Sequence, residues 1–275
     1  YLPDIILQEG ITATSQISKL EKEYHSIFMV IPSKFVANIL TDFKSESVKF
    51  SKNCNFVICS KGIENKSLKF VSDIIRSFYP SNNIAVLSGP NFAIEIAKSL
   101  PAITTLACED KKIADSIIAI LKNDQFHPYY SDDIISTQLC GALKNILAIA
   151  VGIATGSNAS DSTKSAIITK GMNEMSEIIV AMGGSKESLM QPCAIGDVTL
   201  TCLSLKSRNM SLGYELGAGK TLQQILDNRS SIAEGVETSK AVNKIIKRHN
   251  LNCDIFTKLY RILHEGLDIS KVSFI

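Results

Sequence analysis

The sequence predicts an α/β part followed by an all-α part, with a boundary near residue 130. Two observations carry this prediction. Up to about residue 121, short apolar runs alternate with helical patterns, which is typical of a sheet whose strands are linked by helices. After about Ser131 the strand signals largely vanish and long helical patterns take over. We therefore expect one unit at residues 1–130 and a second at 131–275.

The elements of the first unit follow from its apolar runs. The run that ends at Pro32 is continuous, as expected for a strand buried on both faces. Because strands and helices alternate with short links, we expect the strands to be parallel. Strands are predicted at 25–32, 55–60, 83–87 and 102–108, and helices from about 33, at 67–78, up to 96 and at 111–121.

The second unit is predicted to be helical throughout. Residues 134–154 form a long, weakly polar helical run, and residues 163–182 form another. The remainder has a helical pattern with glycine-containing breaks at 183–184, 217–219 and 235.

Composition excludes several classes of protein. The 275 residues are 45% hydrophobic and 20% charged, with a formal net charge of +2, so no overall field favours nucleic acid or an anionic membrane. We find no apolar run near the ~18 residues that span a bilayer, and no secretory signal. Seven scattered cysteines without a C-x-x-C pair, and four histidines without ligand spacing, predict reduced thiols, a cytoplasmic location and no metal.

The segment around Lys144 is the most informative one. Gly141, Lys144 and Ala148 share one helix face, and Lys144 is the only charged residue between Asp133 and Asp161. A ligand can approach an ammonium group flanked by such small residues, and partly dry surroundings lower a lysine pKa, which suits proton transfer. A lysine that snorkels from the rim of a buried helix stays an open alternative.

Two acidic residues have two interpretations each. Asp197 follows Gly196 before an apolar run, where a carboxylate is more often a helix cap but can also orient a lysine. Glu234 begins a helical pattern, and it is either an ordinary first-turn acid or a contact to a ribose or carboxamide group.

Ser207, Arg208 and Asn209 mark the start of another helix. Ser207 has N-cap character, and Gly217 or Gly219 can end the helix. A cation in the first turn departs from the usual preference for acids, but it becomes sensible if a phosphate binds there. A solvated arginine is the alternative.

Two further segments follow predicted strands. Ser60-Lys61-Gly62 comes after one strand and Ser88–Ala93 after the next, and in open parallel sheets ligands bind at the carboxyl ends of strands. The Gly89-Pro90 pair is also ordinary turn chemistry.

Taken together and in this order, these segments resemble the bacterial-type NAD(P)-dependent glycerol-3-phosphate dehydrogenases. The combination is more specific than any single segment. The matching stretches are Ser60–Gly62, Ser88–Ala93, Gly141–Asn145, Ile168–Gly171, Ile195–Asp197, Ser207–Asn209 and Glu234-Gly235.

The resemblance implies a Rossmann-like N-terminal domain at 1–130 and a helical substrate domain at 131–275. It also implies NAD or NADP as the cofactor, dihydroxyacetone phosphate and glycerol 3-phosphate as substrates, a supply role for phospholipid synthesis, and compatibility with a homodimer. By the same resemblance, Lys144 is the acid and base. The implied substrate contacts are Lys61, Gly89, Asn91, Lys144, Asp197, Ser207, Arg208 and Asn209; the implied cofactor contacts are Lys61, Ala93, Arg208, Ile232 and Glu234.

One family feature has no counterpart in these 275 residues. The G-x-G-x-x-G turn of the first strand–helix unit does not occur. We expect Tyr1–Asp4 to correspond to a point after the family's second strand and its helix, so that the Rossmann-like domain lacks its first strands and exposes a sheet edge. Two alternatives stay open: an inactive remnant that binds at most a phosphate ester, and a related dehydrogenase of a hydroxy acid.

Overall fold

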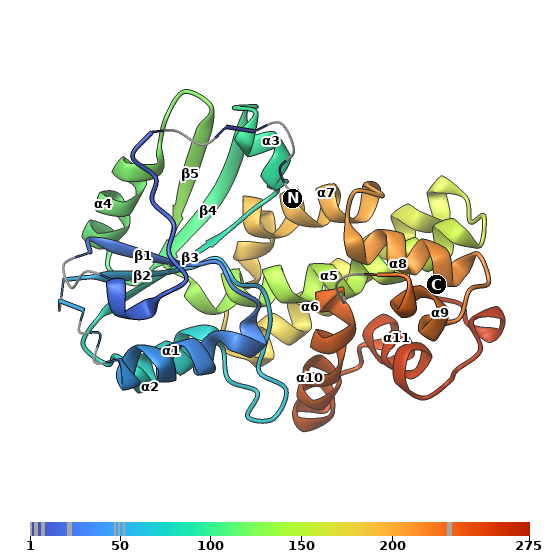
Figure 1. Ribbon diagram of the computed structural model, residues 1–275. Helices are drawn as coiled ribbons and strands as arrows, with labels where there is room; N and C mark the ends of the chain where they lie inside the picture. Colours follow the sequence, from blue (N-terminus) through green and yellow to red (C-terminus); the bar gives the residue numbers. More distant parts are fainter. Residues whose placement is uncertain are drawn as a thin grey trace.

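The structure is a computed structural model that describes residues 2, 5–6, 9–20, 24–46, 48, 50–51, 53–229 and 233–275. A five-stranded sheet with flanking helices lies beside a group of helices, and the long helix α5 runs from the sheet into that group (Figure 1). The strands are β1 (Ser26–Met29), β2 (Asn55–Ile58), β3 (Asn83–Ser88), β4 (Ala102–Cys108) and β5 (Phe126–Ser131).

The sheet has the strand order β1-β2-β3-β4-β5, but it is not fully parallel as expected. Strand β4 runs antiparallel to β3, with Ser88 opposite Thr105, and β5 runs parallel to β4. The physical reason is the connection at 89–101. Its only helix, α3 (Ala93–Ala97), is five residues long, and a parallel crossover needs a longer element to cover the sheet.

Helices cover both faces of the sheet, because successive residues of its central strands point to opposite faces and are apolar on both. Phe56 and Ile58 pack with α1 (Val36–Ser45) and α2 (Val71–Phe78), whereas Val57 packs with α4 (Lys111–Leu121) on the other face. The short helices η1 (Ile17–Lys19) and η2 (Ser33–Phe35) precede α1.

Strand β1 is an edge strand of the described sheet. Phe28 pairs with Val57 and therefore points to the same face, yet Phe28 is 36% exposed while Val57 is fully buried. The helix α4 that covers Val57 leaves this part of the face uncovered. The predicted start at Tyr1–Asp4 falls mostly on residues outside the described ones.

The second group of helices surrounds α5 (Ile134–Gly156), which is buried along almost its whole length. By length and composition α5 could cross a membrane. The sequence did not indicate this, because Lys144 and other polar residues interrupt its apolar run. In the structure, 89% of the most apolar 18-residue stretch of α5 is packed inside the protein. The other elements are α6 (Asp161–Ala181), η3 (Lys186–Met190), the π-helix η4 (Pro192–Gly196), α7 (Asp197–Leu203), α8 (Arg208–Gly217), α9 (Leu222–Asp227), α10 (Glu234–His249), α11 (Asp254–His264) and η5 (Ile269–Lys271).

Helices α5 and α8 touch through their backbones. Gly152 and Gly156 of α5 face Gly213 and Gly217 of α8, and a Cβ atom on any of the four would overlap backbone atoms of the opposite helix. We call these four residues the glycine seam. It fixes the position of α8 against α5, and thereby the start of α8 near the middle of α5.

Candidate active site

Lys144 lies in the middle of α5 and its side chain is almost fully buried, with 7% of the residue exposed. Its Nζ atom donates to Oδ1 of Asp197 at 2.6 Å and to Oγ1 of Thr201 at 2.9 Å, both on α7. The ammonium group therefore ends on buried partners and does not reach water as a snorkelling lysine would.

Asp197 is the centre of this cluster. Its second oxygen, Oδ2, accepts from Nζ of Lys61 at 2.8 Å, so one carboxylate lies between two ammonium groups. The cap interpretation of Asp197 is wrong: α7 shows no side-chain cap bond, and both carboxylate oxygens bind lysines. Lys61 reaches Asp197 from the segment that follows β2, so the sheet and the helices meet at this residue.

The two lysines have different proton affinities. Burial, and then the positive charge of Lys61, lower the pKa of Lys144 from 10.5 to about 8 although Asp197 opposes this effect. Burial also acts to lower the pKa of Lys61, but the charge of Asp197 and the hydrogen bond to it outweigh burial, so that this pKa is raised. Lys61 therefore stays charged, while Lys144 titrates near neutral pH.

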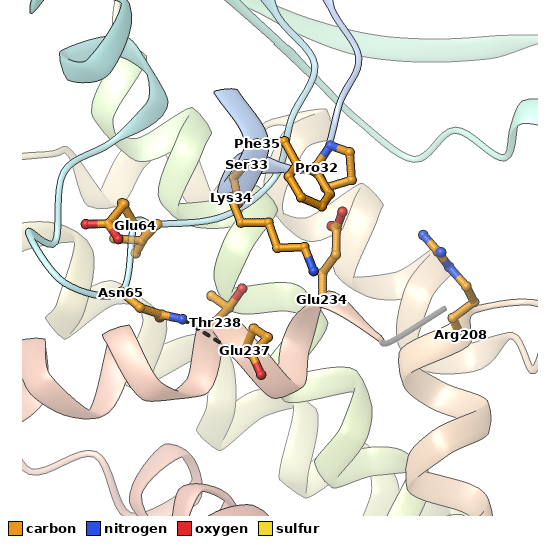
Figure 2. A pocket seen from close by; sticks show the side chains of 11 residues that line it. Pro32, Ser33, Lys34, Phe35, Glu64, Asn65, Arg208, Glu234, Glu237 and Thr238 are labelled. Atoms are coloured by element: carbon orange, nitrogen blue, oxygen red, sulfur yellow. Dashed lines mark hydrogen bonds between the residues drawn. The ribbon is translucent and has the colours of Figure 1, made fainter. Parts of the chain in front are cut away.

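The start of α8 has the form that the sequence predicts. The Ser207 hydroxyl accepts from the backbone N–H of Met210 as the N-cap, Arg208 is the first helical residue, and α8 ends at Gly217. Arg208 and Glu234, the first residue of α10, both line one cavity (Figure 2).

Glu234 links this cavity to the lysine cluster. Burial raises the pKa of its carboxyl, and the positive charges of Arg208, Lys61 and Lys144 counteract that effect. The start of α10 also lies against α5, because the backbone N–H of Gly235 donates to Asn209, whose amide donates to Asn145, the neighbour of Lys144. Glu234 is thus a first-turn acid and a wall residue of the cavity at once.

Asn209 connects three helices. Its Nδ2 donates to Oδ1 of Asn145 on α5 at 3.0 Å, and its Oδ1 accepts from the backbone N–H of Gly235 on α10 at 3.0 Å. Its side chain holds the starts of α8 and α10 against α5.

The segment after β3 lies beside the cluster. Gly89 packs against β4, where a Cβ atom would come within 2.7 Å of Cα of Thr104. Asn91 donates to the carbonyl of Ile103 at 2.9 Å. A Cβ atom on Gly196, the neighbour of Asp197, would lie 3.3 Å from Cγ of Pro90. Gly89 is therefore required by packing at this position, and Asn91 holds the loop.

Two predicted cofactor residues, Lys61 and Ala93, do not line the cavity. Ala93 is an exposed first residue of α3 and does not line it, and Ile232 lies outside the described residues.

The cavity has a volume of about 510 Å³. Its wall includes residues that the sequence did not single out, from the segments after β1 and β2 and from the first turns of α10; they are Pro32, Ser33, Lys34, Phe35, Ile63, Glu64, Asn65, Glu237 and Thr238. For the residues at 32–35 and 63–65, the position shortly after a predicted strand was an available signal. Thr201 was also missed, although it follows Asp197 by one helical turn.

Known proteins match this chain over nearly its whole length. The model of the NAD-dependent glycerol-3-phosphate dehydrogenase N-terminus matches residues 1–114, and that of the C-terminus matches residues 133–273. The glycerol-3-phosphate dehydrogenase [NAD(P)+] of Parvibaculum lavamentivorans is 38% identical over 263 residues, covering 96% of this chain and 78% of that protein. The enzyme of the same name from Ehrlichia chaffeensis is 38% identical over 274 residues, covering 98% and 84%.

The fold agrees with the sequence match. The crystal structure of glycerol-3-phosphate dehydrogenase from Coxiella burnetii superposes with a TM-score of 0.91 at 29% identity, covering 98% of this chain and 82% of that one. The Rossmann-like sheet followed by a helical part is thus confirmed. The chain belongs to the NAD-dependent glycerol-3-phosphate dehydrogenase family.

Proposed function

We propose that this protein interconverts dihydroxyacetone phosphate and sn-glycerol 3-phosphate with NADH or NADPH. The observation that carries the proposal is the buried Lys144–Asp197–Lys61 cluster at the middle of α5, against which Asn209 holds the starts of α8 and α10 that carry Arg208 and Glu234. A proton donor and an anion-binding cation are thus available at one site.

Lys144 is proposed as the acid and base. Reduction of a ketone requires a proton at the carbonyl oxygen, and an ammonium group whose pKa is about 8 can both give that proton and take it back near neutral pH. Its positive charge also stabilises the alkoxide that develops at that oxygen. Asp197 and Thr201 hold the Nζ atom in place.

Arg208 is proposed to bind the phosphate. Its guanidinium can form two parallel hydrogen bonds to phosphate oxygens, and the N-terminus of the ten-residue helix α8 adds the favourable end of the helix dipole. Binding energy from the phosphate would position the distant carbonyl against Lys144. Ser207, Asn209, Gly89 and Asn91 are proposed to complete this end of the site.

The cavity wall fits the ribose and nicotinamide part of a dinucleotide. Oδ1 of Asn65 is buried in this wall and has no hydrogen-bond partner among the described residues, so an amide or hydroxyl hydrogen of a ligand would satisfy it. The Glu234 carboxylate can accept from ribose hydroxyls, and Lys61, Ala93, Arg208 and Ile232 stay proposed cofactor contacts. When bound, the nicotinamide supplies or takes up the hydride.

We further propose that residues 1–130 bind the dinucleotide and residues 131–275 bind the substrate. Strand β5 ends at Ser131 and α5 begins at Ile134, which supports a division there. We also propose a cytoplasmic homodimer that supplies glycerol 3-phosphate for phospholipid synthesis. Seven free cysteines support a reducing compartment; cell fractionation and light scattering on the purified protein test the location and the dimer.

The activity is tested by the loss of NADH or NADPH absorbance when dihydroxyacetone phosphate is added to the purified protein. Parallel assays use ketopantoate and a 2-keto acid without phosphate. Turnover that requires dihydroxyacetone phosphate supports the proposal. Turnover of ketopantoate or the keto acid in its place would overturn it.

A further inference from the structure

Arg229 contacts the start of α8 from the segment that follows α9, and it has no role in the proposed chemistry. Its Nη1 donates to the backbone carbonyl of Arg208 at 2.9 Å. Its Nη2 donates to Oγ of Ser211 at 3.0 Å and to Oε1 of Glu215 at 2.6 Å. One guanidinium group therefore spans about two turns of the helix that begins with the proposed phosphate-binding residue.

Helix α9 presents Arg229 to α8. Thr221 and Gln224 form a capping box at the N-terminus of α9, and the buried Ile225 packs this helix against the core. After the helix ends, the backbone N–H of Arg229 donates to the carbonyl of Leu226 at 3.2 Å. The Arg229 side chain is only 17% exposed, so it is not a freely moving surface arginine.

The hydrogen bonds form a closed cycle around the carbonyl oxygen of Arg208. This oxygen accepts from Nη1 of Arg229 and from Oγ of Ser211 at 3.3 Å, and the same hydroxyl accepts from Nη2 of Arg229. Hydrogen bonds from a charged donor are about twice as strong as those between neutral groups. Helix ends tend to open locally, and this cycle opposes such opening at the first residue of α8.

The contact lies on the face of α8 opposite the glycine seam. At about 100° per residue, positions 208, 211 and 215 lie within about 60° of one another, whereas Gly213 and Gly217 lie about 140–180° from position 208. The seam holds one face of α8 against α5, and Arg229 holds the other face. The helix is therefore fixed from two sides.

The charge of Arg229 is compensated within the same contact. Oε1 of Glu215 pairs with Arg229 at 2.6 Å, and Oε2 pairs with Lys220 at 2.8 Å. Hydrogen bonds from Lys220 and from Arg229 lower the pKa of Glu215, so its carboxylate is charged at neutral pH. This negative charge reduces the repulsion between the two neighbouring arginines, so that Arg229 can hold the backbone of Arg208 without driving its side chain away.

We propose that Arg229 is a positioning residue for the phosphate of the substrate, because it fixes the backbone that carries the Arg208 guanidinium. Arg229 does not line the cavity, so it acts through Arg208. A binding group that is already fixed loses less conformational freedom when the ligand arrives, and this raises affinity without a new contact. The inference rests on the phosphate role that the proposed function gives to Arg208.

The main test is Arg229→Lys, which keeps the positive charge but cannot reach three acceptors with the planar fork of a guanidinium. We expect the KM for dihydroxyacetone phosphate to rise on the order of tenfold, as for the ordering of one long side chain on binding, with kcat little changed. Unphosphorylated dihydroxyacetone lacks the group that Arg208 binds, so its kinetics should not change. A general loss of structure would affect both substrates equally and would overturn the proposal.

A second readout needs no activity. The backbone N–H of Ser211 donates to the carbonyl of Ser207 at 2.9 Å, and hydrogen–deuterium exchange of this part of α8 reports how often the first turn opens. Exchange should be faster in Arg229→Lys than in the original protein. Faster exchange with an unchanged KM would make Arg229 a purely structural residue and would also overturn the proposal. Failure of the proposed function shows in the original protein, as no turnover of dihydroxyacetone phosphate, whereas failure of this inference shows only in the variants.

Two further variants complete the test. Lys220→Ala is the matched control, because it removes the other cation of Glu215 without a contact to the carbonyl of Arg208. It should leave both the KM and the exchange unchanged. Ser211→Ala opens the same cycle of hydrogen bonds from α8 itself and should raise the KM in the same direction, so it decides the question even if Arg229→Lys does not fold. A rise in KM that Lys220→Ala shares, or no rise in either Arg229→Lys or Ser211→Ala, is the result that contradicts the proposal.

Discussion

Replacing Asp197 by Asn tests the electrostatic account of the site. Asparagine keeps the shape of the side chain but removes the charge that faces Nζ of Lys144 at 2.6 Å and Nζ of Lys61 at 2.8 Å. Removing one partner of a buried ion pair costs about 3–5 kcal/mol, because the other charge stays buried. Lys144 relieves this cost by losing its proton.

The size of the effect follows from the pKa of Lys144, which is about 8 in the intact cluster. A loss of about 3 kcal/mol corresponds to a further decrease in this pKa of about two units, at 1.36 kcal/mol per unit. Lys144 would then be mostly neutral at neutral pH. Ketone reduction needs the protonated form, so it should slow by at least about tenfold there, and by about 10²–10⁴-fold if the proton is also misplaced.

The assay is the rate of NADH oxidation at saturating dihydroxyacetone phosphate, measured from mildly acidic to alkaline pH. In the original protein, reduction should fall as the pH rises through about 8, and the reverse oxidation, which needs the neutral amine, should rise over the same range. In Asp197→Asn both profiles should move to lower pH. An unchanged profile with a rate close to the original would refute the reasoning.

The chain contains a matched control. Asp254 also lies between two lysines, Lys170 and Lys258, each at 2.8 Å, but its side chain is 38% exposed. Exposed ion pairs of this kind contribute about 0–1 kcal/mol. Asp254→Asn should therefore leave both pH profiles where they are.

Three further substitutions test the other parts of the site. Lys144→Ala should lower kcat by about 10²–10⁴-fold with dihydroxyacetone phosphate, and a change confined to KM would reassign Lys144 to binding. Arg208→Lys should raise the KM for dihydroxyacetone phosphate, because an ammonium cannot replace two parallel hydrogen bonds; unphosphorylated dihydroxyacetone should be affected little, and an equal effect on both would contradict the phosphate role. Gly213→Ala places a Cβ against the Ile149 carbonyl and should lower the free energy of unfolding by about 1–3 kcal/mol, measured by urea denaturation, whereas an unchanged midpoint would show that the glycine seam can open.

Much of the fold was predictable, because the apolar pattern of a short stretch of sequence defines where most of its strands and helices begin and end. Strand β4 and helix α4 have the bounds that their apolar patterns indicate. Strand β5 was missed because Pro128 and its polar neighbours are not typical of a strand, and only pairing with β4 stabilises it. The antiparallel turn before β4 depends on the length of α3, which the sequence pattern did not define.

A site residue could be predicted from the sequence where its surroundings leave few possible roles for it. Lys144 was recognised because it is the only charge in a long apolar helix and small residues flank it. The role of Asp197 stayed open between a helix cap and a counter-charge for the lysine, because a carboxylate after a glycine suits both; the counter-charge is the one that the structure shows. Only the packing of α7 against α5 decides between these two. Lys34 and Phe35 carried no pattern of their own, and the cavity that they line is formed by segments far apart in the chain.

The glycine seam has a consequence for which molecules this enzyme accepts. Lys144 belongs to one of the two helices joined there and Arg208 begins the other, so main-chain atoms in contact fix the relative positions of the backbones that carry the proposed proton donor and the proposed phosphate-binding residue. Side chains can change rotamer to suit a guest, but touching backbones cannot. Because Asp197 and Thr201 also hold Nζ of Lys144, we expect the proposed site to accept only a narrow range of distances between phosphate and carbonyl, so that a phosphate ester one carbon longer or shorter than dihydroxyacetone phosphate should react more slowly.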